Sequence, residues 1–120
     1  MLFRSDLGAK LAPLRDDGVL FVASGNVLHN LGLMDRSRPD TAFAWGEAYD
    51  EAATAFMTER PGDIAALYEH EHHRLAAPTP DHLLPAFYLA GMAAESGDTT
   101  EVFTDGYLMG SLSMTSYLLR

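Results

Sequence analysis

The sequence predicts an α/β fold, in which helices flank a mixed, mainly parallel sheet. An amphipathic stretch at residues 3–15 predicts a helix, which ends at Asp16, Asp17 and Gly18. The uninterrupted apolar run Val19–Ala23 follows at once. β-branched and aromatic residues without polar alternation are typical of a strand that is buried on both faces of a parallel sheet. A helix, a short turn and a buried strand in this order indicate the α/β class.

Four segments have apolar side chains at helical spacing: residues 3–15, 42–60, 64–71 and 82–94. The second segment carries Trp45, Tyr49 and Phe56 on one face, which we expect to pack in the core. Asp63 is a candidate N-cap of the third helix. The proline-rich residues 76–81 predict a stiff loop before the fourth helix.

Two extended segments are predicted near the end of the chain, at Thr100–Phe103 and Ser111–Leu118. The second of them shows partial alternation of polar and apolar residues. Both follow the stop signal at Glu95–Asp98, which ends the fourth helix.

Composition predicts one acidic globular domain at residues 1–120. The chain has 120 residues, enough for a single core, and its 8 basic and 17 acidic side chains give a net charge of -9. This acidic excess argues against nucleic acid or a membrane surface as a partner. No apolar run approaches the roughly 20 residues of a membrane-spanning helix, and the first residues lack the pattern of a secretory signal. We therefore expect a cytoplasmic protein.

Two histidines stand where a fold can hold a side chain accurately. His29 follows the predicted strand in a glycine-containing loop, and His82 follows the proline-rich loop. The chain has no Cys, so a metal site would use histidines and carboxylates. Imidazole is a good ligand for Fe, Zn, Cu and Ni. His29 and His82 are therefore candidate metal ligands or catalytic residues, and the alternative for each is a hydrogen-bonded structural histidine.

A second group of histidines, His70, His72 and His73, is a weaker candidate. On a helix His70 and His73 share a face, whereas His72 points about 100 degrees away. The segment also lacks the two histidines four residues apart that zinc-binding helices use. It indicates a solvated helix end, with metal binding as the minor alternative.

Three segments carry a resemblance to a known family. They are residues 18–31, with a Ser-Gly-Asn-x-x-His-Asn string, residues 78–85, with a Pro-x-Pro-x-His string, and residues 110–116. In the order and spacing of these segments, the chain resembles the class III extradiol ring-cleavage dioxygenases of the protocatechuate 4,5-dioxygenase beta-subunit superfamily, DOPA 4,5-dioxygenase-like branch. The resemblance extends over almost the whole chain.

The resemblance implies a non-haem metal enzyme that uses O2 to cleave the ring of an ortho-dihydroxy aromatic, such as a catechol or a DOPA-like compound. The implied ion is Fe(II) or Zn(II), and His29 and His82 would lie at the metal centre. His82 matches a metal-site position. His29 matches a position that either ligates the metal or acts as the acid/base for the catechol proton, and the sequence leaves both roles open.

The resemblance also implies that the chain corresponds to the C-terminal half of the family fold, with the N-terminal half absent. Two histidines do not make the facial site that the chemistry requires, and Asp81 and Glu95 are candidate substitutes. We expect a partner chain that supplies the missing half, or a homo-oligomer that completes a site. The alternative is a non-catalytic remnant or pairing half-domain. An apolar strand without neighbours would also favour self-association.

Overall fold

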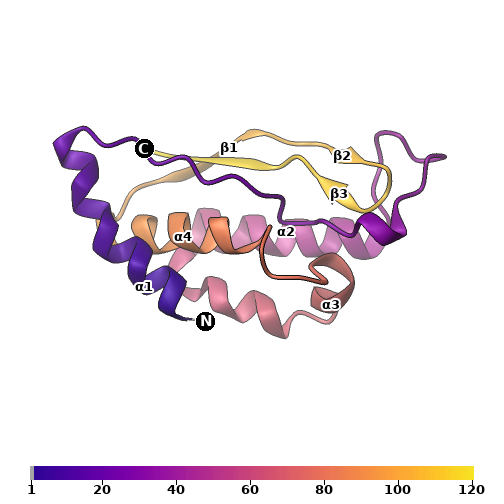
Figure 1. Ribbon diagram of the computed structural model, residues 1–120, viewed down its shortest axis with the longest axis horizontal. Coiled ribbons are helices and arrows are strands. Elements are labelled where there is room, and N and C mark those ends of the chain that lie inside the picture. Colours follow the sequence, from indigo (N-terminus) through magenta and orange to yellow (C-terminus); the bar gives the residue numbers. More distant parts are fainter. Residues whose placement is uncertain (1) are drawn as a thin grey trace.

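The computed structural model describes residues 2–120. Helices form one layer of the molecule and extended segments lie over them (Figure 1). The α-helices are α1 (Leu2–Leu11), α2 (Ala44–Glu59), α3 (His73–Ala76) and α4 (Leu84–Ser96). Three 3₁₀ helices lie at Ala12–Asp17, Leu31–Leu33 and Pro61–Glu69.

The strands pair in two small antiparallel sheets. β1 (Thr100–Thr104) pairs with β4 (Ser116–Leu119), and β2 (Tyr107–Leu108) pairs with β3 (Leu112–Ser113). Within residues 2–120, parallel pairing is confined to one isolated bridge, between Ala42 and Gly110. The mixture of helices and strands agrees with the predicted class, but a mainly parallel sheet is not observed.

The prediction that Val19–Ala23 is a buried strand is wrong for this structure. The segment is extended but belongs to no sheet, and Leu20 and Val22 are 85% and 83% exposed. Its first residue is anchored, because the Val19 amide donates to the Leu14 carbonyl at 3.1 Å. A strand is buried on both faces only when it has neighbours in a sheet. No strand among the described residues is hydrogen-bonded to this one, so its apolar side chains remain exposed.

The predicted helices are present with altered ends. The first helix leaves the α conformation after Leu11, just before Pro13, and continues as a 3₁₀ helix. The third predicted helix is also of the 3₁₀ type, and Asp63 does not cap it, because the residue at its N-cap position is Arg60. The expected late strand Ser111–Leu118 is interrupted between β3 and β4.

The core lies where α2, α4 and the 3₁₀ helix Pro61–Glu69 meet. Tyr49 on α2 and Phe87 on α4 are fully buried there, while Trp45 and Phe56 are partly buried against this core. The predicted apolar face of the second helix is therefore confirmed. The largest fully buried apolar side chains are those of Tyr49, Phe87, Leu28, Met57, Ile64, Leu67, Leu83 and Met92.

Helix α1 packs closely against α4. A Cβ atom at Gly91 of α4 would lie 2.0 Å from the backbone oxygen of Ser5 in α1, so that only glycine permits this approach. The chain leaves α1 through the 3₁₀ helix Ala12–Asp17 and then enters the extended segment that follows Gly18 (Figure 1). In the described part of the chain, no helix combines the length and the apolar character needed to cross a membrane.

Candidate metal and proton-transfer site

The three segments that carry the family resemblance lie close together in the structure. The His29 backbone amide donates to the Ala76 carbonyl at 2.9 Å, beside the proline-rich loop. On its other side, His29 forms an antiparallel bridge with Leu112 of β3. Asn26 adds a further link, since its side-chain amide donates to the Ser113 carbonyl at 2.8 Å. Backbone and side-chain hydrogen bonds to residues far away in the sequence thus fix the loop that contains Asn26 and His29.

The His29 ring is buried and held at both nitrogens. His29 as a whole residue is 5% exposed. Nδ1 lies 2.7 Å from the carbonyl oxygen of Asn26, and Nε2 lies 2.9 Å from the carbonyl oxygen of Thr79. A carbonyl oxygen only accepts, so each contact is a hydrogen bond when that nitrogen carries a hydrogen. A metal ligand needs a nitrogen with a free lone pair, and in this arrangement neither nitrogen of His29 points to open space.

His82 lies beside His29 and is more exposed. The two rings stack with centroids 5.0 Å apart and planes 29° from parallel, and the side chain of His82 is 50% exposed. Gly25 permits the arrangement, because a Cβ atom there would lie 2.2 Å from the His82 carbonyl oxygen. The sequence separated His29 and His82 by 53 positions, and the structure brings them together.

Of the two carboxylates considered as substitute ligands, Asp81 is near the site and Glu95 is not. Asp81 Oδ2 lies 3.6 Å from His82 Nε2. The Thr79 hydroxyl donates to the other carboxylate oxygen of Asp81, and this hydrogen bond lowers the pKa of Asp81. Glu95 lies in the last turn of α4, about 16 Å along the helix from its first residue at 1.5 Å per residue.

The residues described here do not fit a complete metal centre. Within residues 2–120, no three side chains of His, Cys, Asp or Glu come together in a way that could hold a metal ion. His82 and Asp81 offer a pair at the protein surface, and the nitrogens of His29 face carbonyl oxygens. Three protein ligands are the usual minimum for a catalytic ion.

The second group of histidines does not form the predicted helical face. His70 and His72 precede α3 in a turn, where the His72 amide donates to His70 Nδ1 at 3.1 Å. His73 turns toward the core, with its Nδ1 2.8 Å from the Tyr49 hydroxyl. Burial, together with the nearby His29 and His70, lowers the pKa of His73. Sequence reasoning assigned Tyr49 to the core and missed this hydrogen bond.

A buried carboxylate on α2 was also missed by the sequence reasoning. Asp50 is 5% exposed, and its Oδ2 accepts a hydrogen bond of 2.6 Å from the Thr115 hydroxyl. Its Oδ1 is buried without a hydrogen-bond partner among the described residues. Burial raises the pKa of Asp50, and the Thr115 hydrogen bond opposes this shift. In the sequence Asp50 follows the core residue Tyr49, and no pattern marks it as buried.

Comparison with known proteins places the chain in a family. A family model described as the catalytic LigB subunit of aromatic ring-opening dioxygenase matches residues 4–119. The chain belongs to this family. The resemblance inferred from the three segments is thereby confirmed, and these segments are the ones that converge around His29.

Curated proteins are similar to almost the whole length of the chain. The 4,5-DOPA dioxygenase extradiol of Escherichia coli (strain K12) is 36% identical over 115 residues, which are 92% of this chain and 42% of that protein. The protein of the same name from Beta vulgaris is 32% identical over 114 residues, 92% of this chain and 41% of the relative. The chain therefore spans less than half the length of the curated relatives it matches.

A solved structure shows the same relation in three dimensions. The crystal structure of an uncharacterized protein from Escherichia coli K12 superposes with a TM-score of 0.83 at 35% sequence identity. The superposition covers 96% of this chain and 48% of that one. The arrangement of the LigB-family elements in this chain thus matches about half of a longer fold.

Proposed function

We propose that this chain contributes to extradiol ring cleavage, in which O2 opens the ring of an ortho-dihydroxy aromatic such as a catechol or a DOPA-like compound. The proposal rests on one observation above all. His29 and His82, the two histidines singled out in the sequence, stack 5.0 Å apart in a chain of the LigB family. Two curated relatives bear the name 4,5-DOPA dioxygenase extradiol, which supports this substrate class.

In this proposal His82 is a ligand of a non-haem ion, Fe(II) or Zn(II), and His29 handles a proton. Exposure of half the His82 side chain supports the first role, since an exposed imidazole is open to an ion and to ligands from another polypeptide. The two carbonyl contacts of His29 favour the second role over metal ligation, because they suit ring N–H groups. To exchange a proton with the diol, one ring nitrogen would leave its carbonyl partner and reach the substrate.

Because residues 2–120 lack three convergent ligands, the proposal requires further protein groups. We infer that a partner polypeptide, carrying the part of the family fold that lies outside this chain's match, supplies them. The relatives contain such a part, since the match covers only 42% of the E. coli protein. The ion would activate O2 and the diol once these ligands are present. This chain alone would bind metal weakly.

The experiment is an oxygen-uptake assay on a co-expressed pair. The full 120-residue chain is produced together with the part of the E. coli 4,5-DOPA dioxygenase extradiol outside the matched residues, and is given Fe(II) and DOPA or catechol. We expect oxygen uptake and a new absorption band of the ring-opened product. His82→Ala and His29→Ala should each reduce the rate at least about 100-fold, whereas His72→Ala should leave it within about twofold.

Oxygen uptake that survives His82→Ala would contradict the proposed role of this residue. A co-expressed pair that assembles and binds Fe(II) but cleaves no diol would assign the chain instead to a non-catalytic pairing half-domain. Assembly is measured separately, by sedimentation, so that a lack of activity is not confused with a lack of binding.

A further inference from the structure

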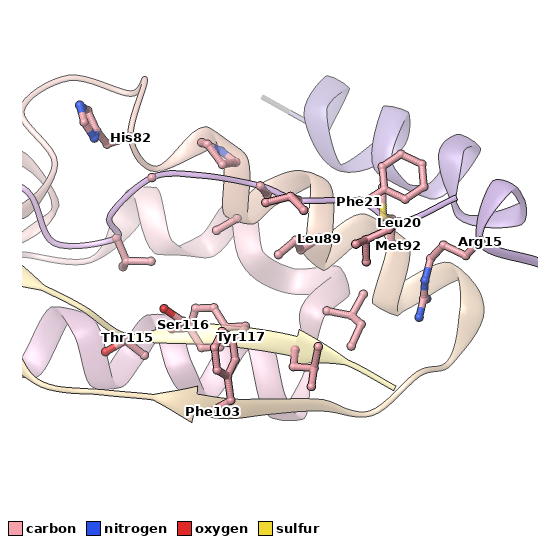
Figure 2. A pocket seen from close by; sticks show the side chains of 18 of the residues that line it. Arg15, Leu20, Phe21, His82, Leu89, Met92, Phe103, Thr115, Ser116 and Tyr117 are labelled. Atoms are coloured by element: carbon pink, nitrogen blue, oxygen red, sulfur yellow. The ribbon is translucent and has the colours of Figure 1, made fainter. Parts of the chain in front are cut away.

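A cleft of about 380 Å³ separates the extended segment Val19–Gly25 from strand β4. In Figure 2 Leu20 and Phe21 belong to one wall, and Thr115, Ser116 and Tyr117 belong to the other, with Phe103 of β1 behind them. Leu89 and Met92 of α4 form part of the floor. We call this space the strand cleft.

The first wall of the strand cleft is a strand edge without a partner. All five residues of Val19–Ala23 line the cleft, although successive side chains of an extended chain point to opposite faces. The cleft therefore runs along the backbone edge of this segment. In the described structure, no backbone amide from Leu20 to Val27 donates to another backbone group. They include the amides of Leu20 and Val22, whose side chains are exposed.

The second wall has the same character. All five residues Thr115–Leu119 line the cleft, and in the described structure β4 pairs with β1 alone. One edge of β4 is therefore occupied and the other is open. Figure 1 shows β4 and the extended segment running over the same helices. Two open edges thus face one apolar space, an arrangement suited to added strands.

The length of the relatives indicates what fills this space. The chain matches 48% of a solved structure with a TM-score of 0.83, so about half of that structure has no counterpart among the elements seen here. Val19–Ala23 has the apolar composition of a doubly buried strand yet is exposed, with Leu20 85% exposed. The unmatched half of the relatives is the polypeptide that would bury it.

We propose that the strand cleft is the docking site of the partner polypeptide, which adds β-structure to the open edges of Val19–Gly25 and β4. This inference rests on the proposed function, because it places the partner that would complete the site. His82 lies at one end of the cleft (Figure 2). The extended segment runs toward this end, since Gly25 contacts the His82 carbonyl. A strand docked parallel to the segment would therefore bring its carboxyl end beside His82.

Proline substitutions test this docking mode without use of activity. Leu20→Pro and Val22→Pro each remove an amide that makes no backbone hydrogen bond in the chain itself, and each places in the proposed pairing segment a residue that central strands exclude. The matched control is Arg36→Pro. Arg36 occupies the second position of the turn closed by the Arg38 amide and the Asp35 carbonyl at 3.0 Å, where proline is favoured. Circular dichroism and thermal melting verify that all three variants fold.

Each variant is co-expressed with the unmatched part of the E. coli relative, and complex formation is measured by co-purification and sedimentation. We expect a one-to-one complex with the unsubstituted chain and with Arg36→Pro, and at least about tenfold weaker binding with Leu20→Pro and Val22→Pro. Amide hydrogen exchange should slow at residues 20–24 on binding.

Three results would overturn the docking proposal. They are a complex that forms equally well with the two proline variants, no complex with the unsubstituted chain, and a tight homodimer that the proline substitutions break. The last result would assign the strand cleft to a second copy of the chain. A complex that behaves as expected but lacks dioxygenase activity would leave the docking site supported and contradict only the proposed function.

Discussion

His29 is a buried polar residue whose structural contacts can be separated from the proton-handling role proposed for it. Its ring joins the carbonyls of Asn26 and Thr79, which belong to separate loops, and it stacks on His82. Neutral imidazole carries only one N–H. Both hydrogen bonds are therefore made together only by the doubly protonated ring, whereas the neutral ring satisfies one carbonyl at a time.

The first prediction concerns the contribution of His29 to the stability of the fold. His29→Phe roughly retains the ring volume but offers no N–H to either carbonyl, so we expect a loss of about 1 to 3 kcal/mol in the free energy of unfolding. His82→Phe is the control, because its half-exposed side chain should cost less than about 0.5 kcal/mol. Urea unfolding measures both. Equal losses in the two variants would contradict this structural role.

The second prediction concerns Asp50 and pH. Because burial raises its pKa in the folded state, Asp50 keeps its proton to a higher pH when folded than when unfolded. Its contribution to stability is therefore most favourable below the unfolded pKa, about 3.9, and declines as the pH rises through the folded pKa. Asp50→Asn removes the buried charge and should raise the free energy of unfolding by about 1 kcal/mol at pH 8.

At pH 4 the gain from Asp50→Asn should be smaller, since the carboxyl of the parent chain then approaches its neutral form. Urea unfolding at pH 4 and pH 8 measures the difference, with the exposed neighbour change Glu51→Gln as control. A benefit from Asp50→Asn that is the same at both pH values would show that Asp50 does not change protonation between them.

At the scale of elements, the site depends on how closely the extended segment passes the proline-rich loop. Gly25 sits against the His82 carbonyl, and Pro85 is also near. The Pro80 carbonyl accepts a hydrogen bond of 2.9 Å from the Leu84 amide, and this bond fixes the proline-rich loop to the first turn of α4. The position of His82 thus depends on the close contact with Gly25 and on the hydrogen bond at the start of α4.

The third prediction tests this contact. Gly25→Ala would place a Cβ atom 2.2 Å from the His82 carbonyl oxygen, so one of the two segments must shift. We expect a loss of about 1 to 3 kcal/mol in stability and a loss of activity in the co-expressed pair. Gly32→Ala is the matched control, since the nearest atom to its added methyl lies 3.4 Å away, and it should change stability by about 0.5 kcal/mol or less. Thermal melting of both variants decides the matter.

Sequence patterns predicted the elements whose conformation depends on interactions within a single segment. The apolar face of α2 and the proline-rich loop were predicted because helical spacing and proline geometry act within one segment. Val19–Ala23 was mispredicted because a strand is buried on both faces only when it pairs with neighbours, and no strand among residues 2–120 pairs with it. The pairing of His29 with His82 was expected from resemblance, but the carbonyls that hold His29 could be found only in three dimensions.

At the scale of the whole molecule, two opposing forces act on the exposed apolar edge. Leu20 and Val22 favour association, whereas a net charge of -9 makes copies of the chain repel one another. Salt screens this repulsion over about 10 Å at 0.1 M. The balance between the apolar edge and the charge should therefore depend on ionic strength when no partner is present.

The fourth prediction follows from this balance. Without a partner, the chain should self-associate weakly through the open edge, and more strongly at 0.5 M than at 0.05 M NaCl, as measured by sedimentation over a range of protein concentrations. The double change Leu20→Glu and Val22→Glu should weaken association at least about tenfold, because it places charge on the contact. Leu31→Glu is the control, since Leu31 is 67% exposed but lies outside the strand cleft. If the chain stays monomeric at high salt, or if Leu31→Glu acts like the double change, the open edge is not the surface that drives association.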